Sequence, residues 1–356
     1  MARREVSMRQ RCRAGMRMVK DTRVTVPGRA GELALAFLLD RILGDPEGWP
    51  HPVRALGWLI SRLEDALRAR NAGPAGEGVA GMAAAAGLLS LTMAIGRTLE
   101  VLSRRLPAAR ACIVYLAYSC LASRELERRA IRVAELLDSG DQEGARMELR
   151  CLVGRDTAGL DHAGACRAAV ESVAENVVDG VIAPLFYYAI GGLPWMLAHK
   201  AVSTLDSMWG YRHPPYRRLG WAGARLDDVM VFLVARFSVL LIALASFLTE
   251  EDWRSALRVG LRDRLLHPSP NSAHGEATFA GALGVALGGG SSYGGRWVER
   301  PIIGAEGRVP DTRDIRRAAR LSRAVSWTGW TVATFYVLAR EARRGGHVAR
   351  SEREGH

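Results

Sequence analysis

Three carboxylates lie at helical spacing just ahead of an apolar stretch. Glu171, Glu175 and Asp179 follow one another at intervals of four residues, and residues at this interval project from one face of an α-helix. Like charges so placed destabilise a helix by roughly 0.2–0.5 kcal/mol per pair, and the apolar residues that follow make an unpaired carboxylate more costly. A Mg²⁺ ion held by carboxylates and substrate phosphates would compensate the charge. The alternative is a solvated acidic face with salt bridges to Arg167 and its neighbours.

A second acidic pair stands before another apolar stretch. Asp227 and Asp228 follow Arg225 and precede residues 229–248. Neighbouring residues point in different directions on a helix, so the two aspartates need not share one ion. They could cap a helix that begins after them and complement its dipole. They could equally organise a metal ion or a phosphate together with Arg225, and the sequence leaves both interpretations open.

Two further groups of polar residues fall in connecting segments. The sequence His267-Pro-Ser-Pro-Asn271 has two prolines that hold the backbone extended, so it suits a rigid binding loop as well as a plain connector. Lys200 precedes a stretch in which Asp206 and Arg212 are mixed with hydroxyl and aromatic residues. Such a stretch could anchor the chain at a membrane interface or form a wall for a flat ligand.

Familiar nucleotide-binding and zinc-binding patterns are absent from the sequence. It contains no GxxxxGK[ST] loop and no GxGxxG after a strand, so an enzyme that uses ATP would bind the nucleotide by another route. The five cysteines have no CxxC spacing, which predicts neither a zinc site nor a disulfide framework.

The positive charge is distributed as in a membrane protein. The net charge is +12 and the pI is about 10.1, which would suit nucleic acid, anionic lipid or an anionic substrate. No zinc-finger spacing, basic region with heptads or RNP-type aromatic motif occurs, so nucleic acid is not an expected partner. Much of the charge lies in a basic N-terminal extension, residues 1–30, and a basic C-terminal tail, residues 341–356. Both flank apolar stretches, as basic residues do on the cytoplasmic side of a membrane.

Apolar segments predict an all-α, polytopic helical membrane protein with about four or five spans. The segments are residues 79–102, 107–122, 177–198, 229–248 and 324–338. Residues 31–340 are expected to form one membrane-embedded catalytic domain with long functional loops, and no convincing strand pattern or internal repeat is visible.

Residues 123–176 differ from these segments and predict a water-facing helical part. Apolar residues recur at helical spacing up to Gly140, which is expected to end the first helix. Asp141 can cap a second helix that runs to about Val153. A third helix begins near Asp161 and continues into the next apolar segment.

Several of these strings occur together in one known family. In chain order they are Leu39–Pro46, His51–Arg54, Leu152–Thr157, Glu171–Tyr187, Lys200–Arg212, Gly220–Asp228, His267–Asn271, Phe279–Val285 and Tyr293–Gly304. Their joint presence resembles the CobD/CbiB family, adenosylcobinamide-phosphate synthase, from about residue 33 to residue 304. The chain departs from the family pattern at Ser203, Val231 and Val234 and in residues 273–277.

The resemblance implies an integral, multi-pass enzyme of the inner membrane. The family uses ATP and Mg²⁺ to join the free carboxylate of adenosylcobyric acid to 1-aminopropan-2-ol phosphate, or a related amino alcohol, through an amide bond. The catalytic residues would be Glu175, Asp179, Asp227, Asp228 and His267, and the metal ligands would be Glu171, Glu175 and Asp179. The residues that bind substrate and phosphate would be Arg54, Arg155, Lys200, Asp206, Arg212, Arg225 and Asn271.

An amide of this kind needs an activated carboxyl group. A carboxylate does not react with an amine at neutral pH, so an acyl phosphate made from ATP is the expected intermediate. His267 is the candidate base that keeps the amine unprotonated. Expected partners are the corrinoid and amino-alcohol phosphate substrates, the lipid bilayer and other membrane-associated enzymes of cobalamin assembly.

Two other classes of protein fit parts of the sequence. A non-catalytic membrane sensor similar to the AmpE-like proteins is one, although a sensor has no need of the acidic and His-Pro strings. A transporter is the other, because glycine and proline break an apolar segment that charged residues also accompany. The absence of an inverted repeat counts against a transporter.

Overall fold

The computed structural model describes residues 28–354 apart from residues 47, 70–72 and 212–214. Most of the basic extension, Arg212 and the side chains of the tail beyond Arg343 therefore lie outside the described residues. The described chain is almost entirely helical, as the sequence predicts. Its helices before the acidic segment are α2 (Arg29–Leu43), α3 (Pro52–Ala69), α4 (Gly73–Leu102), α5 (Pro107–Ser119), α6 (Ser123–Asp138) and α7 (Gln142–Leu149). The remaining helices are α8 (His162–Val177), η1 (Val178–Ile182), α9 (Ala183–Gly191), α10 (Leu193–Trp209), α11 (Trp221–Leu248), α12 (Trp253–Arg262), α13 (Ser272–Leu283) and α14 (Thr312–Glu354).

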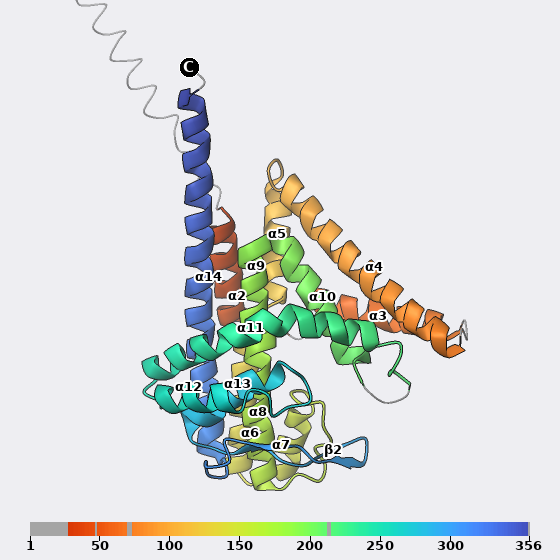
Figure 1. Ribbon diagram of the computed structural model, residues 1–356, viewed down its shortest axis with the longest axis vertical. Coiled ribbons are helices and arrows are strands. Elements are labelled where there is room, and N and C mark those ends of the chain that lie inside the picture. Colours follow the sequence, from red (N-terminus) through yellow and green to blue (C-terminus); the bar gives the residue numbers. More distant parts are fainter. Residues whose placement is uncertain (1–27, 47, 70–72, 212–214, 355–356) are drawn as a thin grey trace, which may run out of the picture.

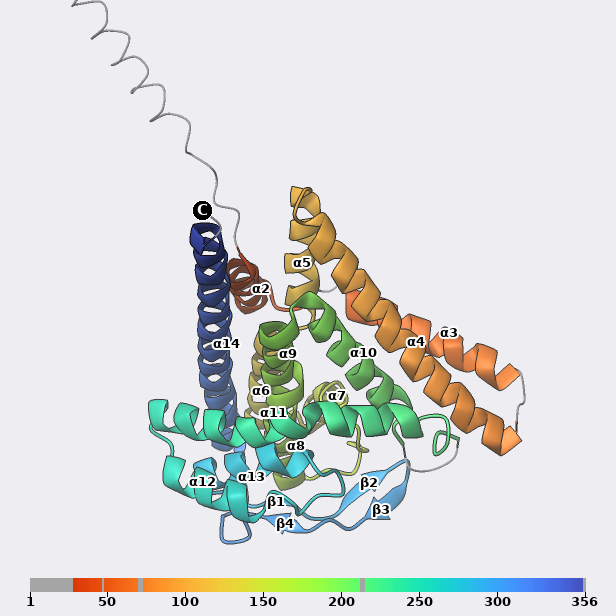
Figure 2. The same cartoon turned by 45° about the horizontal axis from the view of Figure 1, so that its top comes forward.

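The helices are arranged around two hydrophobic cores. The main core lies among α2, α5, α6, α8, α9, α11, α13 and α14. A smaller core joins α3 and α4 to the end of α10 through Ile60, Leu205 and Trp209. Figures 1 and 2 show α14 as a long rod beside α2, with α3 and α4 extending from the opposite side of the molecule. The acidic residues of α8, α10 and α11 lie between these two parts.

Three helical segments in the described chain are long and apolar enough to cross a membrane. They are Ala75–Leu102, His162–Gly191 and Trp221–Leu248. Two of the other predicted spans are accounted for differently. Residues 107–122 form the 13-residue α5, which is only about 20 Å long, and residues 324–338 lie within α14. The chain is a helical membrane protein whose three candidate spans run in different directions in Figure 1, with α11 lying across α8 and α9.

The predicted span over residues 177–198 is wrong in its boundaries. The helix that enters from α8 ends at Gly191, and Gly192 has a φ of 76°, which side chains other than glycine rarely adopt. Pro194 then opens α10 in a new direction. The apolar run is therefore shared by two helices, because the Gly-Gly-Leu-Pro sequence breaks it.

Residues 123–176 form the three predicted helices, α6, α7 and α8, with the expected cap at Asp141. The last of them, α8, belongs to the segment His162–Gly191, which is long and apolar enough to cross a membrane. Asp141 accepts a hydrogen bond from Gly144 N at 2.8 Å and Asp161 accepts one from Gly164 N at 2.7 Å. Gly140, with φ 82°, ends α6. The second helix stops at Leu149, four residues earlier than the sequence predicts. In both cases the short aspartate side chain accepts a hydrogen bond from a backbone N–H of the first turn, as is typical of N-cap residues.

Short strands in the segment 287–303 escaped the sequence analysis. β1 (Leu287–Gly288) pairs with β4 (Ile302–Ile303), and β2 (Ser291–Tyr293) pairs with β3 (Arg296–Val298), both antiparallel. Each strand has only two or three residues, too few for a visible alternation of polar and apolar side chains. These strands place the glycine-rich loop Gly288–Gly290 next to α8, where Gly288 N donates to Glu171.

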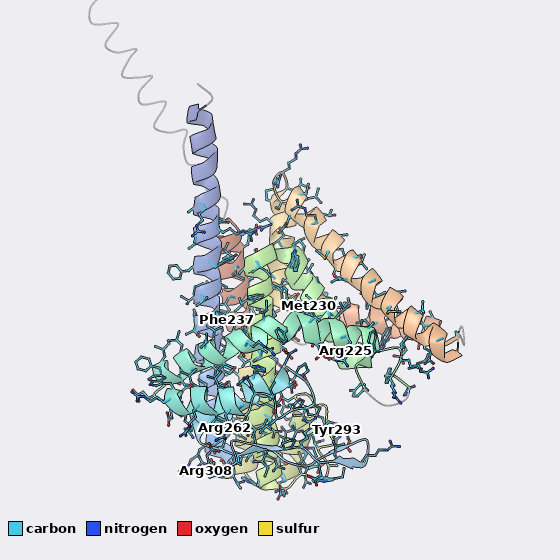
Figure 3. All side chains as sticks on the ribbon, viewed as in Figure 1. Arg225, Met230, Phe237, Arg262, Tyr293 and Arg308 are labelled. Atoms are coloured by element: carbon cyan, nitrogen blue, oxygen red, sulfur yellow. The ribbon has the colours of Figure 1, made fainter. Side chains whose placement is uncertain are left out.

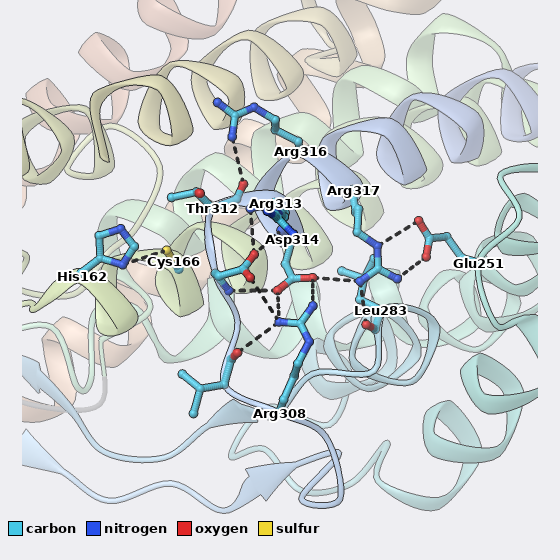
Figure 4. A network of polar contacts seen from close by, with 12 residues as sticks. His162, Cys166, Glu251, Leu283, Arg308, Thr312, Arg313, Asp314, Arg316 and Arg317 are labelled. Atoms are coloured by element: carbon cyan, nitrogen blue, oxygen red, sulfur yellow. Dashed lines mark hydrogen bonds and ion pairs between the residues drawn. The ribbon is translucent and has the colours of Figure 1, made fainter. Parts of the chain in front are cut away.

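The first turn of α14 is fixed by a network of ion pairs (Figure 4). Asp314 is fully buried and accepts hydrogen bonds from Arg308 at 2.6 and 2.7 Å and from Arg317 at 2.8 Å. Arg317 and Arg320 also pair with the buried Glu251 at the end of α11. Burial raises the pKa of Asp314, but bonds from Arg308, the Asp311 backbone and Arg317 outweigh it and hold the pKa below its usual value.

Membrane residence can be tested by extraction. After cell lysis the protein should sediment with membranes and need detergent for release, because the candidate spans bury apolar surface in lipid. The measurement is the distribution of the protein between pellet and supernatant after treatment with carbonate, high salt or detergent. Release by carbonate or salt alone would leave only attachment through the basic surface.

The Asp314 network gives a prediction for stability. Asp314→Asn should reduce the free energy of unfolding by about 1–3 kcal/mol. This is less than the usual loss on breaking a buried ion pair, because Arg308 is half exposed. The folded-state pKa of Asp314 is depressed, so its contribution is present at neutral pH and is lost as pH falls through that pKa. Thermal melting in detergent at pH 7 and below pH 4 measures both effects. An equal penalty at both pH values would contradict a charge-based role.

Candidate active site

The acidic face of α8 continues into a π-helical turn. Glu175 lies near the end of α8, and Asp179 lies in η1, where hydrogen bonds run from residue i to i+5. The π-turn changes the direction of Asp179 relative to an ideal α-helical face. The Gly180 carbonyl in this turn accepts a hydrogen bond from Ala122 N at 3.1 Å, at the start of α6. π-turns are common at functional sites, and this one separates Asp179 from Glu171.

The second acidic pair lies inside a helix and does not cap one. α11 begins at Trp221 with Gly220 as its N-cap, so Asp227 and Asp228 are about two turns into it. The interpretation as a cap is therefore wrong: hydropathy marked the start of the apolar stretch, whereas the helix begins earlier. Asp227 interacts electrostatically with Asp179, Asp206 and Glu175.

Asp228 has different surroundings from its neighbour. Its carboxylate pairs with the exposed Arg225 at 3.2 Å, and its backbone carbonyl accepts from Asn271 Nδ2 at 2.8 Å. Asn271 Oδ1 in turn accepts from Arg236 Nη1 at 3.3 Å. The loop that ends at Asn271 is thus fixed against α11. Figure 3 shows Arg225, Met230 and Phe237 along this helix, and Tyr187 of α9 donates to the Met230 carbonyl at 2.8 Å.

α10 brings a carboxylate and a lysine to the same region. Burial raises the pKa of Asp206 to about 6, and the negative charges of Asp228 and Glu175 add to the effect. Gly210 makes room for this side chain, because a Cβ there would lie 2.0 Å from Asp206 Oδ1. Lys200 lies near enough to Asp179 to attract it electrostatically.

Together these side chains form a carboxylate cluster, defined here as Glu175, Asp179, Asp206 and Asp227. A narrow hollow with a cavity volume of about 20 Å³, the acidic hollow, lies against it. Its polar lining consists of Glu175, Asp179, Asp227, Ser269, Asn271 and Ser272. The carboxylates come from α8, η1, α10 and α11, so the tertiary structure has concentrated negative charge from distant parts of the sequence.

A second hollow lies one turn of α8 away and contains both signs of charge. We call it the mixed-charge hollow; its lining includes Arg155, Glu171, His267, Glu276, Arg300 and the loop residues Gly288 and Gly289. Glu171 forms a buried ion pair with Arg155 and accepts from Gly288 N at 2.6 Å. Arg155 Nη1 also donates to Ser291 Oγ at 3.0 Å. Arg155, a predicted binding residue, thus lines the mixed-charge hollow.

The predicted metal triad is not assembled. Both oxygens of Glu171 are bound within the mixed-charge hollow, while Glu175 and Asp179 belong to the acidic hollow. In the described part of the chain, no three His, Cys, Asp or Glu side chains converge closely enough to hold one metal ion. The π-turn and the Arg155 pair explain the separation, and neither is visible in the spacing of four residues.

The other predicted binding residues lie farther out. Arg54 is exposed at the start of α3, where it donates to Trp49 O at 2.6 Å and faces Asp45 at 4.0 Å. His51 beside it interacts with Lys200, which connects this loop to the carboxylate cluster. Arg225 is 61% exposed and could reach a ligand only at the surface.

Sequence reasoning missed two residues of the mixed-charge hollow. Glu276 is the one charged residue in the small and apolar stretch Ala-His-Gly-Glu-Ala-Thr-Phe-Ala-Gly, and an isolated carboxylate in such a helix was the available signal. Arg300 follows a strand too short to recognise, and we find no sequence signal for it.

Comparison with known proteins places the chain in a family. The profile of the family described as CobD/Cbib protein matches residues 33–322. A cobalamin biosynthesis protein CobD of Pelobacter propionicus is 45% identical over 322 residues, covering 89% of this chain and 97% of the relative. A CobD of Klebsiella pneumoniae is 45% identical over 293 residues, covering 81% and 91%, and a cobalamin biosynthesis protein CbiB of Salmonella paratyphi A is 42% identical over 308 residues, covering 86% and 95%. No solved structure matches the chain. The resemblance inferred from the sequence strings is confirmed, and the chain belongs to the CobD/CbiB family.

Proposed function

We propose that this protein is an ATP-dependent ligase of cobalamin biosynthesis in the inner membrane, which it crosses several times. It joins the free carboxylate of adenosylcobyric acid to 1-aminopropan-2-ol phosphate, or a related amino alcohol, as an amide. Membership of a family whose relatives are named cobalamin biosynthesis proteins supports the pathway. The carboxylate cluster is the structural observation that supports the reaction.

The cluster has more negative charge than its surroundings compensate. Glu175, Asp179 and Asp227 repel one another in a partly buried region, and Lys200 is the cation that attracts Asp179. Buried charges are costly unless they are paired or bind a cation. A bound cation would therefore stabilise the arrangement, which neither a sensor nor a simple structural role requires.

The donor set fits Mg²⁺ bound together with a nucleotide. Mg²⁺ prefers oxygen ligands and is commonly held by one or two carboxylates, with water and substrate phosphates completing its shell. One or two of the carboxylates that line the acidic hollow, Glu175, Asp179 and Asp227, would hold it. The ion would neutralise phosphate charge and assist the transfer of the terminal phosphoryl group.

The protein's own groups can support two steps. In the first, a carboxylate oxygen of the corrinoid bonds to the terminal phosphorus of ATP, and ADP leaves. In the second, the amine nitrogen bonds to the acyl carbon, the bond from that carbon to the phosphate oxygen breaks, and phosphate leaves. Lys200 and Arg155 would balance anionic charge, and His267, in the loop between the two hollows, would accept a proton from the nitrogen.

Replacing a cluster carboxylate tests the site. Asp179→Asn and Asp227→Asn should each lower turnover at least about a hundredfold, roughly 2.7 kcal/mol of barrier, because the amide keeps the shape and loses the charge. Turnover at limiting and saturating Mg²⁺ is the measurement. Asp138→Asn, a surface ion pair with Arg316, is the matched control. Near-normal turnover of both variants at limiting Mg²⁺ would show that the cluster is not part of the active site.

Trapping tests the route. Detergent-purified protein supplied with adenosylcobyric acid, ATP and Mg²⁺, but with hydroxylamine in place of the amino alcohol, should form ADP and a corrinoid hydroxamate. Both products follow from an acyl phosphate and are measured by chromatography with mass detection. AMP in place of ADP, or hydroxamate formation without ATP, would contradict this route.

A further inference from the structure

An apolar groove with a cavity volume of about 180 Å³ lies among α9, α11 and α14, where α11 crosses the other two helices (Figures 1 and 2). Its floor consists of the buried side chains of Leu185, Ala189 and Leu241. Phe237 and Tyr336 line it as well and are exposed, so the groove opens at the surface. Of the lining residues, only Tyr336 has a polar side-chain atom. The groove therefore suits a hydrocarbon ligand.

Part of this space results from a glycine inside a helix. Gly329 lies within α14, and a Cβ added to it would lie 3.6 Å from Leu185 Cδ1 and 3.9 Å from Leu241 Cδ1. These are ordinary van der Waals distances, so neither packing nor backbone conformation requires a glycine here. A glycine inside a helix costs about 0.5–1 kcal/mol relative to alanine. What the missing side chain provides at this position is room in the groove.

Two walls of the groove belong to candidate membrane spans. α9 is part of His162–Gly191 and α11 is part of Trp221–Leu248. Apolar cavities exclude water, and those of about 150 Å³ accept small hydrocarbons. An empty groove would leave its lining without contacts on one side. At this depth of the bilayer, lipid acyl chains are the hydrocarbon that surrounds the protein, so an acyl chain is the expected occupant.

The groove has the length of part of an acyl chain and an arginine at one end. From Gly329 to Tyr336 it follows α14 for about 10 Å, compared with roughly 15 Å of hydrocarbon in one leaflet. Arg340, one turn beyond Tyr336, donates to the carbonyl of Ile190, which lines the groove. Arg343 follows after another turn and is exposed. Guanidinium groups at the end of an apolar groove suit a lipid phosphate.

We propose that this groove binds one acyl chain of an anionic phospholipid, whose phosphate lies against Arg340. Glu341, between the two arginines in sequence, is directed toward α2, because it accepts a hydrogen bond from Arg29 N at 2.8 Å. Its charge therefore does not occupy the phosphate position. No residue of the groove lines either charged hollow, so lipid binding does not depend on the proposed ligase reaction.

Lipid binding to the detergent-purified full-length protein tests the site. The probes are dioleoylphosphatidylglycerol and dioleoylglycerol, which lacks the phosphate. Native mass spectrometry over a lipid titration should show Gly329→Phe binding both lipids at least about tenfold more weakly, because the ring displaces two or more methylene groups. Arg340→Gln should bind the phospholipid roughly threefold to tenfold more weakly and bind dioleoylglycerol as the wild type does.

Thermal melting separates lost binding from lost folding. Dioleoylphosphatidylglycerol should raise the Tm of the wild type, because a ligand that binds only the folded state stabilises it. Without lipid, Gly329→Phe should melt no lower than the wild type, because its ring fills the groove, and lipid should not raise its Tm. Gly329→Leu, with a smaller side chain, should show an intermediate rise.

The matched controls place the same changes outside the groove. Gly87→Phe adds the ring to an exposed position of the candidate span Ala75–Leu102, where a Cβ meets nothing within 4 Å. Arg132→Gln removes an exposed arginine of α6. Both should bind the two lipids as the wild type does.

Unchanged lipid affinity of Gly329→Phe, or equal weakening by Gly87→Phe, would overturn the proposal. So would equal affinity of the wild type for the two lipids. A wild-type protein that is dimeric in lipid-free detergent, with a monomeric Gly329→Phe, would also overturn it, because the groove would then be an interface between two copies of the chain.

Discussion

The carboxylates of the cluster repel one another and are only partly accessible to water. This repulsion is the physical constraint on which the region between α8, α10 and α11 depends. Glu175, Asp179, Asp206 and Asp227 come from α8, η1, α10 and α11, and each raises the cost of ionising the others. Folding keeps them together because hydrophobic packing of the same helices fixes their backbones. The repulsion is therefore a consequence of packing that is itself apolar.

The surrounding structure limits this repulsion without removing it. Arg155 neutralises Glu171, and Lys200 attracts Asp179 from α10. Asn271, just before α13, binds α11 through the Asp228 carbonyl and the Arg236 guanidinium, and its own amide adds no charge. A cluster compensated fully by arginines would have no affinity for a metal ion, whereas an uncompensated one would oppose folding. The compensation observed among the described residues is partial.

Two hollows that differ in charge lie along one face of α8. The acidic hollow is lined by carboxylate, hydroxyl and amide groups, and the mixed-charge hollow is lined by carboxylates and guanidinium groups, of which the Arg300 Nε has no acceptor among the described residues. Their shared border is the face of α8 and the rigid His-Pro-Ser-Pro-Asn loop.

The sequence by itself determined the helical class, the cap at Asp141, the helix start near Asp161, the acidic face of α8 and the family, because these depend on local spacing and on strings of adjacent residues. Only the tertiary structure decided which carboxylates meet. Glu171 is separated from the predicted triad by the π-turn at Asp179 and by its own ion pair with Arg155. Because α11 begins early, at Trp221, Asp227 lies within that helix, and it joins Glu175, Asp179 and Asp206 in the carboxylate cluster. Glu276 and Arg300 became visible in the same way. The physical reason is that charges interact through space, so their pairing depends on the packing of distant helices and not on their separation along the chain.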